Sequence, residues 1–139
     1  MTSLLDHVLV PVANEDDARE TARALAPYDP DSVTVVHVVE KGEGVPDKTP
    51  VEQSEQLAAD AYAAFRETFP DANTETRYAR DVVEEVFAAA ADLDASVVAF
   101  RPREDGLLAR LFSGDRTRKL VTEGDRPVVA LPSREADDA

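Results

Sequence analysis

Ser32-Val-Thr-Val-Val-His-Val-Val39 is the clearest strand signal in the chain, and it decides the fold class. Such runs of β-branched residues are typical of strands that are buried on both faces of a parallel sheet. Similar runs stand at His7–Val12, Ala95–Phe100 and Pro127–Leu131, while the alternating, charged segment Thr74–Tyr78 suits an edge strand. We therefore predict five strands.

Helical patterns separate these strands. Asn14, followed by three acidic residues, predicts the N-cap of a helix that ends near Ala26. Further helices are expected over about Val51–Phe69, after the N-cap Asp81 as far as about Leu93, and over Asp115–Glu123. The buried stripe of the second helix is predicted to be Leu57, Ala61, Ala64 and Phe65.

Strands that alternate with helices predict right-handed crossovers and a mostly parallel, doubly wound α/β sheet with helices on both faces. In such sheets the ligand crevice lies at the carboxyl ends of the strands, where the strand order reverses. That places it among the segments Val12–Asn14, Val39–Lys41 and Phe100–Gly114. The sequence has no internal repeat or linker, so residues 1–132 are expected to form one domain, followed by a disordered acidic tail over 133–139.

The composition excludes several classes of function. The 139 residues carry a net charge of −14, from 29 acidic and 15 basic side chains, and such a surface repels nucleic acid and anionic membranes. The absence of cysteine excludes disulfides, cysteine-ligated zinc and thiol catalysis. No apolar run approaches the ~18 residues of a membrane helix, and no targeting segment is recognised, so the cytoplasm is the expected location.

The basic residues are almost all arginine, with lysine only at Lys41, Lys48 and Lys119. An excess of carboxylates with few lysines is typical of halophilic proteins, because molar salt screens the repulsion within such a surface. An ordinary acidic cytosolic protein is the alternative interpretation.

Five segments, taken in order, are more specific than the pattern of elements. They are Val8-Leu-Val-Pro-Val12, Val33-Thr-Val-Val-His-Val-Val39, Ala95-Ser-Val-Val-Ala-Phe100, Gly106-Leu-Leu-Ala-Arg-Leu-Phe-Ser-Gly114 and Pro127-Val-Val-Ala-Leu-Pro132. In order and spacing they resemble the first, second and fourth strands, the loop after the fourth strand and the closing strand of universal stress proteins. The resemblance implies a Rossmann-like, adenine nucleotide alpha hydrolase-like domain with the strand order 3-2-1-4-5.

The phosphate-binding loop departs from the family pattern. Nucleotide-binding members carry Gly-x-x-Gly, nine residues, and then Gly-Ser or Gly-Thr. Counting back from Gly114, the two earlier glycine positions hold Arg101 and Glu104, and Asp115 stands in place of the hydroxyl residue. Side chains at these positions obstruct the approach of backbone N–H groups to phosphate. A carboxylate about 4 Å from a phosphate repels it by roughly 4 kcal/mol at an effective dielectric of about 20, which is roughly a thousandfold in affinity.

The segment just after the first strand, on the opposite wall of the predicted crevice, also departs from the family pattern. Nucleotide-binding members usually have an aspartate just after the first strand, where this chain has Ala13 and Asn14. No cofactor is therefore expected, and ATP binding is predicted to be weak or absent. The candidate crevice residues are Val12, Ala13, Asn14, Val39, Phe100, Arg101, Arg103, Glu104, Gly114, Asp115 and Arg116.

A local excess of positive charge favours binding of an anion. The segment from position 101 to position 119 contains six cations and only three acids, Glu104, Asp105 and Asp115. One interpretation is a site for ATP or another phosphate-containing anion, rebuilt from guanidinium groups. The other is pairing with the chain's own carboxylates or with a second subunit. The cations are Arg101, Arg103, Arg110, Arg116, Arg118 and Lys119.

No catalytic or metal-binding residue is predicted. His37, in its Val-rich strand, is interpreted as a hydrogen-bonded core residue, and neither His7 nor His37 has the companions of a metal site. No nucleophile motif and no Walker loop is present. A slow ATP hydrolase is the least supported hypothesis because the glycines are missing.

The last strand is a candidate for self-association. An exposed apolar edge is a pairing site, and the resemblance implies a homodimer through this strand; a covered edge in a monomer is the alternative. The leading hypothesis is a non-enzymatic stress-response protein that acts as a homodimer and contacts an unidentified protein partner, and the competitor is an anion-binding sensor. The predicted dimer residues are Val128, Val129, Ala130 and Leu131.

Overall fold

The computed structural model describes residues 3–40, 51–101 and 126–132. Its centre is a five-stranded sheet in the order β3-β2-β1-β4-β5, and every neighbouring pair is parallel. The predicted strand order is confirmed. The strands are β1 (Val8–Pro11), β2 (Val33–Glu40), β3 (Asn73–Ala79), β4 (Val97–Phe100) and β5 (Val128–Ala130).

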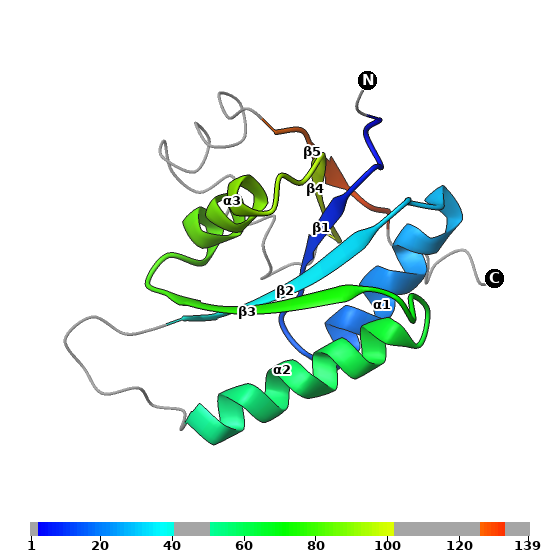
Figure 1. Cartoon of the computed structure of the whole chain (residues 1–139). Coiled ribbons are helices and arrows are strands. Elements are labelled where there is room, and N and C mark those ends of the chain that lie inside the picture. Colours follow the sequence, from blue (N-terminus) through cyan, green and yellow to red (C-terminus); the bar gives the residue numbers. More distant parts are fainter. Residues whose placement is uncertain (1–2, 41–50, 102–125, 133–139) are drawn as a thin grey trace.

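Helices cover both faces of this sheet (Figure 1). Helices α1 and α2 lie side by side on one face, and α3 lies on the other. The helices are α1 (Glu15–Leu25), the short 3₁₀ helix η1 (Ala26–Tyr28), α2 (Val51–Arg66) and α3 (Val82–Asp92). The predicted helix over Asp115–Glu123, the loop over Gly106–Gly114 and the tail over 133–139 lie outside the described residues.

Both predicted N-caps are confirmed. The Asn14 side chain accepts the backbone N–H of Asp17 at 2.8 Å, and the Asp81 side chain accepts that of Glu84 at 3.0 Å. Each cap satisfies one of the backbone donors that a helix leaves unpaired at its start. The sequence therefore determines where α1 and α3 begin.

One predicted core residue is wrong. Leu57 is 43% exposed, whereas its neighbour Ala58 is 3% exposed. Consecutive residues of a helix point about 100° apart, so on this turn Ala58 faces the core in place of Leu57, while the other three predicted residues, Ala61, Ala64 and Phe65, are buried. Helices α1 and α2 pack closely through alanines, and a leucine on that line would hold them apart. The buried residues of α2 are Ser54, Ala58, Ala61, Ala64 and Phe65.

Two apolar cores flank the sheet. Val8, Val10 and Val12 pack on the side of α1 and α2, while Leu9 packs on the side of α3. This alternation follows from the period of two in a strand that is buried on both faces. Because all strands run parallel, the ends of β1, β2 and β4 meet at one edge of the sheet, and this edge carries the candidate site.

Among the described residues, no helix combines the length and the apolar character that crossing a bilayer requires.

Candidate functional site

The segment after β1 lies at the edge of the sheet where the ligand crevice is predicted. The Val12 N–H donates to the Val36 carbonyl at 3.0 Å, and the Val12 carbonyl lies 3.0 Å from Nδ1 of His37. His37 is 7% exposed and hydrogen-bonded, which agrees with its interpretation as a core residue. The backbone of Val12 is therefore fully engaged inside the protein.

A buried carboxylate, that of Asp17, contacts this segment, and sequence reasoning does not assign it to the site. The side chain is in the first turn of α1, and the residue is 7% exposed. Its Oδ2 accepts the Ala13 N–H at 2.8 Å, and its Oδ1 lies 3.3 Å from the Thr21 hydroxyl. An N-cap residue followed three positions later by an acid has the spacing of a capping box, and Asn14 and Asp17 have this spacing, although Asp17 accepts the N–H of Ala13 and not that of the N-cap residue. That signal could have identified Asp17.

Arg101 reaches the same carboxylate from the end of β4. One of its terminal nitrogens lies 3.5 Å from Oδ1 of Asp17, and its side chain is 16% exposed. Its Nε is buried and has no hydrogen-bond partner among the residues that the structure describes. Of the two interpretations left open for the arginines, Arg101 therefore shows internal pairing. The remaining cations of that cluster, from Arg103 to Lys119, lie outside the described residues.

The structure brings together five of the predicted crevice residues. Val39, the predicted residue on β2, is half-buried near the same edge of the sheet. Arg103, Glu104, Gly114, Asp115 and Arg116 lie outside the described residues. The five that gather at the ends of β1 and β4 are Val12, Ala13, Asn14, Phe100 and Arg101.

The electrostatics of the β1–α1 turn disfavour an added anion. The first turn of α1 carries three carboxylates, and the Asp17 N–H that a phosphate could bind is already taken by Asn14. Helix N-termini attract anions, but acidic side chains in the first turn satisfy that preference internally. Within the described ranges, no cluster of three or more histidine or acidic side chains is arranged to hold a metal ion.

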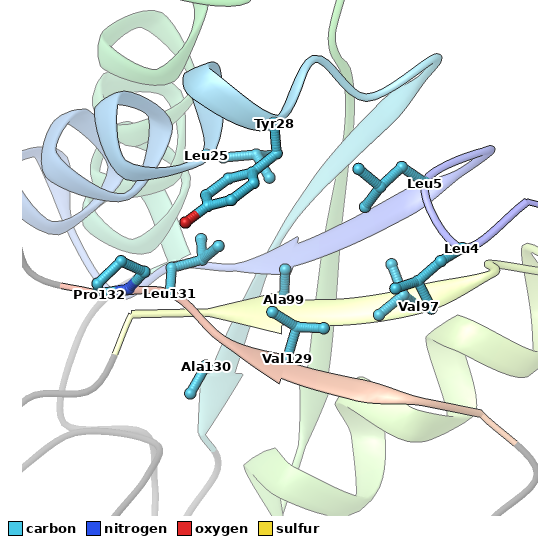
Figure 2. A pocket seen from close by; sticks show the side chains of 10 residues that line it. All are labelled: Leu4, Leu5, Leu25, Tyr28, Val97, Ala99, Val129, Ala130, Leu131 and Pro132. Atoms are coloured by element: carbon cyan, nitrogen blue, oxygen red, sulfur yellow. The ribbon is translucent and has the colours of Figure 1, made fainter.

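An apolar pocket lies elsewhere, beside the edge strand β5 (Figure 2). It has a volume of about 260 Å³, and none of the described residues that line it is charged. It is therefore unsuited to a phosphate. Figure 2 shows the ring of Tyr28 near Leu25 and Leu131. The lining residues are Leu4, Leu5, Leu25, Tyr28, Val97, Ala99, Val129, Ala130, Leu131 and Pro132.

Comparison with known proteins decides the family. The model of the universal stress protein family matches residues 5–132. The chain belongs to the universal stress protein family. This match confirms the resemblance that the five sequence segments indicate. No curated protein sequence matches the chain.

Solved structures of universal stress proteins share the fold. The protein from Archaeoglobus fulgidus in complex with dAMP is 18% identical, with a TM-score of 0.60 over 93% of this chain and 99% of that one. A member from Burkholderia pseudomallei is 17% identical, with a TM-score of 0.63 over 95% and 99%. A universal stress protein in complex with cAMP is 12% identical, with a TM-score of 0.60 over 94% and 99%. At these identities the likeness establishes the fold of this chain alone.

Proposed function

We propose that this chain is a non-enzymatic stress-response protein of the cytoplasm that acts as a homodimer and binds nucleotide weakly or not at all. The observation that carries the proposal is the Asp17 carboxylate, which takes the Ala13 N–H and pairs with Arg101 at the end of the central strands. A phosphate there would have to displace or approach a buried negative charge. In the family's phosphate-binding loop pattern, Arg101 and Glu104 replace two glycines and Asp115 replaces a hydroxyl residue. These differences also weaken the binding of a phosphate.

The competing proposal is an anion sensor. Two of the similar solved structures hold dAMP and cAMP, so nucleotides are the first ligands to consider. The buried Nε of Arg101 is the observation that favours it, because it has no partner among the described residues. A guanidinium with a spare N–H can bind an oxyanion more strongly than a neutral donor does.

Calorimetry separates the two proposals. Titration of the protein with ATP, AMP and inorganic phosphate is expected to give no measurable heat, because a roughly thousandfold loss moves a micromolar Kd to about 1 mM. The Arg101→Ala/Arg103→Ala variant serves as the matched control. We also expect no nucleotide absorbance at 260 nm in the supernatant of the denatured, purified protein. A micromolar Kd that the double variant loses would establish the sensor instead.

The dimer is proposed to form through the outer edge of β5, which is an edge strand among the described residues. Val98 N–H donates to the Pro127 carbonyl, and Leu131 N–H donates to the Phe100 carbonyl. Backbone groups of a strand face its two neighbours alternately, so those of Val128 and Ala130 point away from β4. Leu131 is 2% exposed, so its side chain serves the core of its own subunit. The apolar pocket beside β5 supports association at this edge. An uncharged surface adds no repulsion when a second acidic subunit binds there.

Sedimentation equilibrium of the Ala130→Pro variant tests this edge. The wild type in molar KCl, which screens the charge of −14 on each subunit, is expected at twice the chain mass of 15.1 kDa. Ala130→Pro removes an N–H that faces outward and leaves the bonds to β4 in place, so a folded monomer is expected. Ala130→Ser keeps the N–H and should remain dimeric. A monomeric wild type, or two variants that dimerise equally well, would contradict the proposal.

A further inference from the structure

The Asp17 carboxylate lies where donors from three elements converge. Ala13 contributes a backbone N–H from the turn after β1, at 2.8 Å. Thr21 contributes a hydroxyl from the second turn of α1, at 3.3 Å. Arg101 contributes a guanidinium from the end of β4, at 3.5 Å. The carboxylate is thus held by donors that include the turn after β1 and the end of β4, two strands that are neighbours in the sheet.

These donors are the kind that bind small oxyanions. A backbone N–H at the start of a helix, a hydroxyl and a guanidinium together offer directed hydrogen bonds and a full positive charge. Asp17 and Arg101 are both largely withdrawn from water, so the charge pair is screened less than a surface pair would be. The Arg101 Nε adds a buried donor with no partner among the described residues.

We infer that Asp17 is a built-in anion that fills an oxyanion site in the crevice, and that this site accepts a small free carboxylate once the Asp17 side chain is removed. The inference rests on the proposed function, since it gives the physical reason why the crevice rejects a ligand phosphate. Formate is the probe of choice, because it carries the two oxygens of the missing side chain and is small enough for the space that alanine would leave.

Chemical rescue of the Asp17→Ala variant tests the inference. In KCl we expect its Tm to fall by roughly 8 °C, because a buried guanidinium loses its partner. Replacing chloride with formate at equal ionic strength should raise the Tm of the variant by roughly 3 °C more than that of the wild type. If the variant is unfolded in KCl, recovery of its helical circular dichroism in formate is the readout.

Two further variants make the result specific. Asp81→Ala likewise removes an aspartate that accepts a backbone N–H at the start of a helix, in this case as the N-cap of α3, so it should show no formate-specific gain. Asp17→Ala/Arg101→Met removes the cation as well, and its gain in formate should disappear. The inference is overturned if Asp17→Ala gains no more than the wild type, stays unfolded in formate, or is rescued equally in the double variant. A wild type that binds ATP would refute the proposed function but not this result, since no nucleotide is present.

Discussion

Replacing Arg77 with methionine is expected to lower the free energy of unfolding by about 2 kcal/mol at low salt. The guanidinium of Arg77, on β3, binds three carboxylates: Glu75 on its own strand, and Glu85 and Asp92 on α3. Hydrogen bonds to Asp92, Glu85 and Glu75 raise the pKa of Arg77 above its ordinary value, so the side chain stays charged at every accessible pH. Its removal would leave three negative charges facing one another.

Urea unfolding at two salt concentrations measures this effect. The deficit of Arg77→Met should shrink in molar KCl, which screens the repulsion among the remaining carboxylates. Arg23→Met is the matched control, because Arg23 is 61% exposed and contacts only Glu20, at 3.8 Å, among the ion pairs described. A change of less than about 0.5 kcal/mol is expected there. Equal losses in the two variants would show that the cluster on β3 contributes no more than an ordinary surface pair.

The Arg77 cluster shows why the fold could be predicted further than its side-chain contacts. The alternating charges of Thr74–Tyr78 identify an edge strand, and the structure places β3 at the edge of the sheet. Strand order and N-caps follow from local rules that act within a few residues. The pairing of Arg77 with Asp92 joins residues that only the packing of α3 on β3 brings together. No local pattern specifies such a contact.

The candidate site also combines positions that local rules predict with a side-chain contact that only the packing creates. The ends of β1 and β4 are predictable from the topology, and the structure has these two strands side by side, with Ala13 and Arg101 just after their ends. The partner of Arg101 was not predictable, because 29 acidic residues offer many candidates and the sequence does not rank them. The geometry selects Asp17, whose carboxylate turns back from the first turn of α1 to the Ala13 N–H after β1.

Replacing Phe65 with alanine is expected to lower the free energy of unfolding by about 4 kcal/mol. Phe65 is fully buried in the core between α1, α2 and the sheet. Its ring is stacked on that of Phe69, with centroids 5.4 Å apart and an angle of 22° between the planes. The substitution removes this contact and leaves a cavity that closely packed alanines on α1 and α2 cannot close. Urea unfolding monitored by circular dichroism measures the loss.

The matched control is Leu57→Ala on the same helix. Sequence periodicity predicts that Leu57 and Phe65 lie on one buried stripe, whereas the structure leaves Leu57 43% exposed. A residue that is already partly in water loses little on truncation, so a change below about 1 kcal/mol is expected. Comparable losses at both positions would mean that α2 is rotated toward the stripe that periodicity predicts. A large loss at Phe65 alone fixes the orientation of α2 against the sheet, with Ala58 and Ala61 facing inward.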